Sequence, residues 1–285
     1  MVPLAAMPPE AVTAAAVTPE PVTSAVWPLA VLPPLLPLPA PGLSSWGVAL
    51  AANLVLIALA QRAPVLTRAG WIHAGVLGTL LWGSLGPRGW LAVVAYLAAG
   101  SLVTRLGWRR KQEAGVAEAR GGRRGPANVW GSALVGCGLG LLASVSPPGW
   151  QPVLLLGFAA SFSAKLADTF GSEIGKRWGR TTLLITTLRP VPPGTEGAVS
   201  LEGTAASLLG GALMAAMMLG LGLLQGWGSW LLVTGVALLA TLLESLIGAT
   251  LQQRLPWLSN ELVNGLQTAI AAVLAVALAL ASSRP

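Results

Sequence analysis

The chain has 285 residues, of which 54% are hydrophobic and only 9% carry a charge. Soluble domains contain about 25% charged residues, so the composition excludes an ordinary soluble domain and indicates a multi-pass membrane protein. The net charge of +7 is then expected to orient the chain in the bilayer and to attract lipid head groups or phosphorylated substrates, and nucleic acid is not expected as a partner. The single cysteine, Cys137, excludes an intrachain disulfide and a cysteine metal cluster.

Residues 1–42 differ from the rest of the chain in composition. They are rich in Pro, Ala and Val, they contain no Lys or Arg, and six prolines interrupt the stretch from Trp27 to Gly42. A secretory signal needs a basic start and an unbroken apolar segment. We therefore expect an extended, disordered or interfacial leader, followed by an integral membrane domain at residues 43–285.

Apolar segments in that domain predict an all-α polytopic membrane bundle of about eight transmembrane helices. The expected helices span about 46–61, 71–87, 89–107, 129–146, 150–170, 203–225, 229–252 and 264–282. The segments at 71–87 and 129–146 are short and rich in glycine, so a tilted, re-entrant or buried helix is the alternative there, with seven or nine crossings. The glycine spacings are too loose to define a dimer face, so an oligomer is left open.

With eight crossings, fifteen of the Lys and Arg residues fall on or near one side of the membrane, and only Arg88 and Arg284 fall on the other. The positive-inside rule then places the basic loops in the cytoplasm and both termini opposite. The loops at 62–70, 108–128, 171–202 and 253–263 share the cytoplasmic face, where a nucleotide is available. We expect the active face to be cytoplasmic.

Residues 165–207 hold five basic and four acidic groups in a chain that is otherwise almost uncharged. Charges near a bilayer are costly unless they have a purpose, so this segment is the candidate active site. Lys165 and Asp168 are three residues apart and can pair on one helical face. Asp168 suits Mg²⁺ and Lys165 suits a phosphate, the alternative being a structural pair. Lys176 could reach the same anion if the helix continues.

The segment from Thr186 to Gly203 reads as an ordered loop that could bind phosphate through backbone N–H groups, hydroxyls and a helix start. It lacks the Walker A pattern, and a plain connector is the alternative. Its candidate residues are Thr187, Arg189, Gly194, Thr195, Glu196, Gly197, Ser200, Glu202 and Gly203.

Further polar candidates stand in otherwise apolar surroundings. Glu244 follows an apolar stretch, and we favour a metal or nucleotide role for this carboxylate. Asn260 and Asn264 start a polar stripe on the last helix, although Asn260 could simply be an N-cap. The basic loop that ends at Asn128 could close over an anionic ligand or anchor the topology.

Four stretches carry a resemblance to a known family. They are SAKLADTFGSEIGKRWG at 163–179, TLRPVPPGTEGAVSLEG at 187–203, ESLIGATLQ at 244–252 and SNELVNG at 259–265. Together they resemble the phytyl-phosphate kinases of cyanobacteria and plastids, within a wider family of multi-pass membrane proteins, and the likeness covers roughly residues 46–282. A looser similarity extends to polyprenol and dolichol kinases, which typically offer a lysine where Ala198 and Val199 stand here.

The resemblance implies a membrane kinase that moves a phosphoryl group from a nucleoside triphosphate, often CTP, to phytyl or another prenyl monophosphate. The diphosphate product would serve tocopherol and phylloquinone synthesis and phytol salvage. The implied location is a cyanobacterial plasma or thylakoid membrane. Such chemistry mainly needs charge neutralisation and alignment.

On this hypothesis, Asp168, Glu173 and Glu244 hold Mg²⁺, with Glu202 as an alternative helper. Lys165, Lys176 and Arg189 join Asp168 as catalytic groups that grip phosphates. The loop residues from Thr187 to Gly203 shape the nucleotide site, and three asparagines orient either substrate: Asn128, Asn260 and Asn264.

Two other classes of protein fit parts of the pattern. A transporter of lipid phosphates or small molecules would also place polar stripes in a glycine-rich bundle. A cytidylyltransferase that makes a CDP-lipid would use a similar site but would release pyrophosphate.

Overall fold

The computed structural model describes Leu38 and residues 42–282. The expected leader at residues 1–42 therefore lies outside the described residues, apart from Leu38 and Gly42. The described chain is all-α, as predicted, with a single hairpin of two-residue strands, β1 (Leu183–Leu184) and β2 (Ala198–Val199). Its α helices are α1 (Leu43–Ala60), α2 (Arg68–Arg105), α3 (Trp108–Glu113), α4 (Pro126–Val145), α5 (Gln151–Trp178), α6 (Leu201–Gly220), α7 (Gly226–Ile247) and α8 (Asn260–Ser282).

Five of the described helices are long and apolar enough to cross a membrane, namely α4, α5, α6, α8, and α7 together with the π-helical turn η3 (Gly248–Gln252) that continues it. Ser45–Ala60 within α1 is a shorter apolar helix. The chain is therefore a multi-pass integral membrane protein. The expected total of eight crossings requires both arms of α2 to cross as well, and that stays a prediction.

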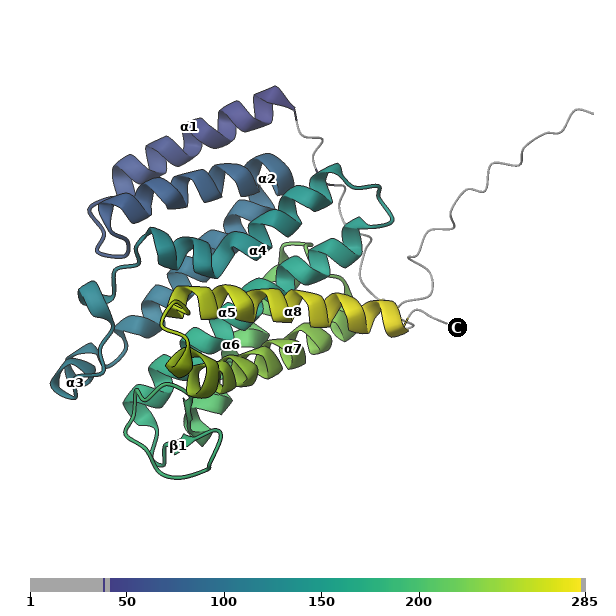
Figure 1. Cartoon of the computed structure of the whole chain (residues 1–285). Coiled ribbons are helices and arrows are strands. Elements are labelled where there is room, and N and C mark those ends of the chain that lie inside the picture. Colours follow the sequence, from purple (N-terminus) through teal and green to yellow (C-terminus); the bar gives the residue numbers. More distant parts are fainter. Residues whose placement is uncertain (1–37, 39–41, 283–285) are drawn as a thin grey trace, which may run out of the picture.

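Helix α2 occupies the place of two expected helices, 71–87 and 89–107. It folds back on itself at Gly86, whose φ of 71° suits glycine, just before Pro87. The two arms lie side by side, since the rings of Trp82 and Trp90 are 5.4 Å apart. Arg105 at the end of α2 donates a 2.9 Å hydrogen bond to the carbonyl of Pro64, close to where α2 begins. The element is thus a helical hairpin (Figure 1).

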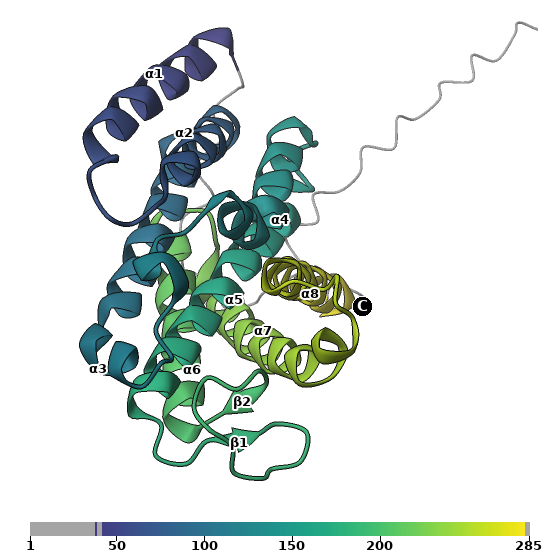
Figure 2. The same ribbon diagram turned by 60° about the vertical axis from the view of Figure 1, so that its left-hand side comes forward.

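Helix α5 is the central element of the bundle. Every residue from Leu155 to Ala167 is buried, which is the pattern of a helix surrounded by others. It packs against α2, α4, α6, α7 and α8, and Figure 2 shows it between α4, α8 and α7. With 28 residues it is roughly 42 Å long, so it extends beyond the expected end at residue 170 and out of a hydrocarbon core of about 30 Å.

The contact between α5 and α6 depends on residues without side chains. A Cβ atom on Gly203 would lie 2.9 Å from the carbonyl oxygen of Gly171, and one on Gly210 would lie 2.9 Å from that of Leu166. Small residues let membrane helices approach closely. This close approach brings the start of α6 against the polar end of α5.

The polar loops gather at one end of the bundle, on the left in Figure 1. The backbone N–H of Thr67 donates to the carbonyl of Arg124 at 3.1 Å, which ties the α1–α2 loop to the loop before α4. Asn128 at the start of α4 donates to Glu261 at the start of α8 at 3.1 Å. The four loops expected to share a face therefore do so.

Candidate functional site

A polar cavity of about 260 Å³ opens at this loop end. Its walls come from α2, α4, α5, α6, α7 and α8 and from the loops at 118–124 and 193–200. Most of its lining residues are polar or glycine. The site is thus built from segments that are far apart in the sequence and that meet around the end of α5.

Lys165 and Asp168 form an ion pair on α5, as their spacing predicted. The Nζ atom of Lys165 also donates a 2.9 Å hydrogen bond to Asn264 on α8. Lys165 is 6% exposed, and a buried charge needs such partners. The pair therefore fixes the side of α5 that faces the cavity and connects it to α8.

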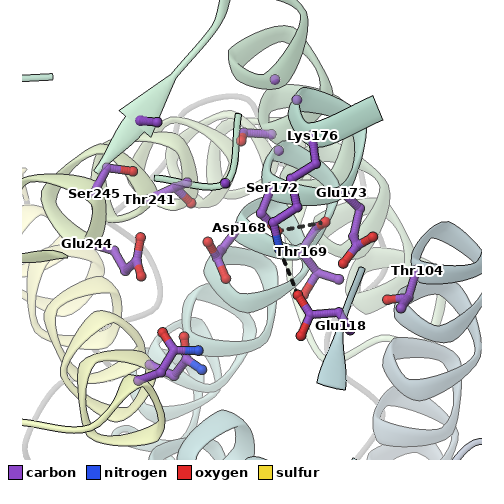
Figure 3. A pocket seen from close by; sticks show the side chains of 18 of the residues that line it. Thr104, Glu118, Asp168, Thr169, Ser172, Glu173, Lys176, Thr241, Glu244 and Ser245 are labelled. Atoms are coloured by element: carbon purple, nitrogen blue, oxygen red, sulfur yellow. Dashed lines mark hydrogen bonds and ion pairs between the residues drawn. The ribbon is translucent and has the colours of Figure 1, made fainter. Parts of the chain in front are cut away.

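Glu244 lies on α7 across the cavity from Asp168, and Figure 3 shows the two carboxylates pointing toward one another. Thr241, one turn earlier on α7, receives a 3.2 Å hydrogen bond from Gln267 of α8, and Gln267 also donates to the carbonyl of Ala164 at 3.1 Å. This network holds α5, α7 and α8 together directly beneath the two acids.

Two further acids on the cavity wall are paired with lysines. Lys176 donates to Glu118 at 2.8 Å, a contact drawn in Figure 3. Burial raises the pKa of Glu118, but the attraction and hydrogen bond of Lys176, together with smaller contributions from Glu173 and Lys165, lower the pKa overall. Glu173 pairs with Lys111 of α3, and both side chains are almost completely buried.

The loop that joins β1 to α6 closes one side of the cavity. Gly197 has a φ of 76°, and a Cβ atom there would lie 2.7 Å from the carbonyl oxygen of Ser245, so only glycine lets the loop dock on α7 and η3. Ser200 caps α6 by accepting the N–H of Gly203 at 3.1 Å. Burial raises the pKa of Glu196, partly opposed by Lys176. The loop thus presents a helix start and backbone to the cavity.

Three arginines of the loop before α4 also line the cavity: Arg120, Arg123 and Arg124. In contrast to Lys165 and Lys176, they form no ion pair with a carboxylate among residues 42–282. Their guanidinium groups are therefore the cations that remain available to an anionic ligand.

Most of the residues singled out in the sequence lie on this cavity. Those that line it are Asn128, Lys165, Asp168, Glu173, Lys176, Gly194, Thr195, Glu196, Gly197, Ser200, Gly203, Glu244, Asn260 and Asn264. Asn260 is the first residue of α8, and the N-cap hydroxyl comes instead from Ser259, which accepts the N–H of Leu262 at 3.3 Å.

Three of the expected site residues lie elsewhere. Thr187 and Arg189 are exposed in the turn beyond β1 and are not part of the cavity wall. Glu202 faces Arg180 at 3.9 Å, outside the cavity. The turn after β1 carries Thr187 and Arg189 away because β1 pairs with β2 and leaves the connecting loop projecting from the bundle (Figure 2).

Glu118 and Tyr96 belong to the cavity wall, although no motif in the sequence pointed to them. Glu118 lies 58 residues from its partner Lys176, and Tyr96 sits in an apolar helix. The only signal for this side of the site was the basic loop that ends at Asn128, for which closure over an anion and a topological role were both left open.

The described residues contain no group of three or more His, Cys, Asp or Glu that could hold a metal by themselves, so a magnesium ion here would need further ligands from a substrate. Asp168, although it is paired with Lys165, faces Glu244 across the cavity, whereas Glu173 is paired with the almost completely buried Lys111 of α3. Mg²⁺ commonly binds through one or two carboxylates together with the phosphates of a substrate. Asp168 and Glu244 could supply that share of the ligands.

Comparisons with known proteins place the chain among membrane proteins. The model of the integral membrane protein family DUF92 matches residues 51–272. A membrane protein of Synechocystis, sll0875, is 51% identical over 81% of this chain and 90% of its own length. Protein VTE6, chloroplastic, of Arabidopsis thaliana is 39% identical over 81% of this chain and 71% of its length. A membrane protein of Methanocaldococcus jannaschii, MJ0933, is 30% identical over 78% of this chain and 89% of its length.

No solved structure matches the chain. The sequence matches confirm the resemblance to a family of multi-pass membrane proteins with cyanobacterial and plastid members.

Proposed function

The chain belongs to the DUF92 family of integral membrane proteins, and on that premise we propose that it is a membrane phosphotransferase acting on prenyl monophosphates. It moves the γ-phosphoryl group of a nucleoside triphosphate, with CTP as the expected donor, to phytyl monophosphate or a related prenyl monophosphate. The similarity to the chloroplastic protein VTE6 and the resemblance of the site motifs to phytyl-phosphate kinases both support this substrate class.

The observation that carries the proposal is the polar cavity in which Asp168 and Glu244 face each other. Around these acids stand basic side chains, the glycine-rich loop and the start of α6. Phosphoryl transfer needs charge neutralisation and alignment of two anionic groups more than it needs proton transfer. A cavity of this composition at the end of a membrane bundle supplies both.

The reaction balances without a general base. An oxygen of the acceptor monophosphate, already ionised, attacks the γ-phosphorus, and the bond from that phosphorus to the β–γ bridging oxygen breaks to release the nucleoside diphosphate. Magnesium, when bound at Asp168 and Glu244, would neutralise charge on the phosphates. The basic side chains hold the two substrates in line, and the loop at 193–200 excludes water from one side.

The setting follows from the same hypothesis. A lipid substrate suits an enzyme whose helices cross the bilayer, with the cavity at the cytoplasmic end where CTP is present. The product would be the prenyl diphosphate consumed in tocopherol and phylloquinone synthesis, and phytol salvage would supply the substrate. A cyanobacterial plasma or thylakoid membrane is the proposed location.

The test is product analysis with the purified protein in detergent micelles, supplied with Mg²⁺, CTP and phytyl monophosphate. We expect CDP and phytyl diphosphate in equal amounts, with no requirement for a membrane gradient. Release of pyrophosphate with a CDP-lipid would identify a cytidylyltransferase instead. Absence of any nucleotide-dependent product, together with gradient-dependent uptake in vesicles, would identify a transporter.

A further inference from the structure

A second cavity, of about 230 Å³, lies between α1, both arms of α2 and α4. Its walls are almost entirely apolar and include Ile57, Val93, Leu97 and Ala133. Such walls offer a nucleotide few hydrogen-bonding groups, whereas they suit a hydrocarbon chain.

The apolar cavity adjoins the polar cavity. Tyr96, Arg124, Asn128 and Ser132 line both of them. The boundary between apolar and polar walls therefore falls at these four residues, and a ligand that occupies both cavities must have one charged and one hydrocarbon end.

Arg124 is held in place at this boundary. Its Nη1 atom donates a 2.8 Å hydrogen bond to the hydroxyl of Tyr96, and its guanidinium carbon lies 5.3 Å from the centre of the tyrosine ring. The backbone N–H of Arg124 also donates to Val65 at 3.0 Å. Because no carboxylate among residues 42–282 forms an ion pair with it, this positioned guanidinium charge is left available to an anionic group.

A partly buried hydrogen bond joins α1 to α2 on the wall of the apolar cavity. Asn53 of α1 accepts the indole N–H of Trp90 at 3.1 Å, and both residues line the cavity. Ala60 lines it near the loop end of α1, and the seven residues from Ala60 to Asn53 rise about 10 Å along the helix. The cavity thus runs from the loop end toward the middle of the bundle.

We propose that this apolar cavity binds the isoprenoid chain of the prenyl monophosphate, with Arg124 on its phosphate, so that the acceptor phosphate is presented to the polar cavity. This assignment rests on the proposed function. It adds where the lipid substrate binds and which of its ends faces the polar cavity. The first isoprene units lie along α1, α2 and α4, and the pair of Asn53 and Trp90 marks the inner limit of the buried part of the chain.

The first test uses the unmodified sequence. A prenyl monophosphate with a diazirine on its second isoprene unit is irradiated with the detergent-solubilised protein, and the adducts are mapped by mass spectrometry. We expect adducts on α1, α2 and α4 at cavity residues such as Ile57, Val93 and Leu97, and their loss when phytyl monophosphate competes. Adducts confined to outward-facing residues, or displaced equally well by a phospholipid, would overturn the proposal.

A matched pair of variants tests the same point by kinetics. Val93→Trp fills the cavity, whereas Val76→Trp changes an exposed valine on the other arm of α2 that does not line it. We expect Val93→Trp to raise the KM for phytyl monophosphate at least tenfold with the KM for CTP unchanged, and Val76→Trp to leave both unchanged. Equal effects of the two variants would contradict the assignment.

The outcomes separate this proposal from the proposed function. Cavity adducts that phytyl monophosphate displaces, found without any CTP-dependent product, would support the isoprenoid-binding site and would refute the kinase activity. A CTP-dependent product together with adducts only outside the cavity would support the kinase activity and would refute the isoprenoid-binding site.

Discussion

An ion pair beside the cavity shows how buried charges are compensated in this protein. Lys111 and Glu173 form an ion pair whose side chains are 1% and 3% exposed, and the Nζ atom of Lys111 also donates to the carbonyl of Thr104. This pair joins α3 and α2 to α5. Removing one member of a buried ion pair leaves the other charge without compensation.

We therefore expect Glu173→Gln to destabilise the protein by about 3–5 kcal/mol, measured as loss of folded protein on thermal or denaturant unfolding in detergent. The double variant Lys111→Met with Glu173→Leu, which removes both charges, should recover most of that loss. Equal stability of Glu173→Gln and the parent protein would show that the pair contributes nothing.

The spacing of residues in the sequence predicted some of these contacts and could not predict others. The spacing of Lys165 and Asp168 allowed them to pair, because three residues bring side chains to one face of a helix, and they do. The pairing of Lys176 with Glu118 joins residues 58 positions apart, and it depends on how the loop before α4 returns to α5. Arg189 looked like a phosphate ligand by composition, but the turn after β1 holds it away from the cavity.

At the level of elements, the π-helical turn η3 accommodates the glycine-rich loop. It follows α7 directly and places Ala249 against Gly197, next to the carbonyl of Ser245 at the end of α7. π-Helical turns often occur at functional sites. Here the glycine-rich loop packs against this turn, next to Glu244.

Replacing Gly197 with alanine tests this docking. The left-handed backbone costs a residue with a Cβ about 1–2 kcal/mol, and the new atom would meet Ser245 and Ala249. We expect CTP-dependent turnover to fall at least tenfold and protease cleavage within 179–200 to increase. The control is Gly138→Ala, at a helical position with open space around it, and it should behave like the parent protein. If Gly197→Ala also behaves like the parent protein, the loop has no part in the site.

Element boundaries were less predictable than element positions. Helix α5 continues to Trp178, although its apolar pattern ends near residue 170, because the last turns pack against α6 through glycine and do not need an apolar face. The expected helices 71–87 and 89–107 both exist as arms of α2, and Gly86 with Pro87 turns the chain between them.

On the scale of the whole molecule, all the polar loops lie at one end of an apolar bundle (Figure 1). This arrangement was predictable because the count of Lys and Arg depends only on the order of the helices. What the sequence could not provide was the meeting of two cavities, since their walls together come from seven helices and from loops that are far apart in the sequence.

Cysteine accessibility tests the orientation. Cys137, the sole cysteine of the chain, is buried, so maleimide labelling of an added cysteine can be measured without a contribution from Cys137. We expect a membrane-impermeant maleimide to label Pro148→Cys, between α4 and α5, in intact cells and Thr187→Cys only after the membrane is opened. Labelling of Thr187→Cys in intact cells would place the cavity outside the cytoplasm.

The measurement that tests the central claim most directly is the rate of γ-phosphoryl transfer from CTP to phytyl monophosphate by folded Asp168→Asn and Glu244→Gln variants, with Glu202→Gln as the matched acid outside the cavity. Losing a group that stabilises charge in the transition state typically costs about 10²–10³ in rate. We expect losses of that size for the two cavity variants and a nearly unchanged rate for Glu202→Gln. Near-normal transfer by both Asp168→Asn and Glu244→Gln would contradict the account.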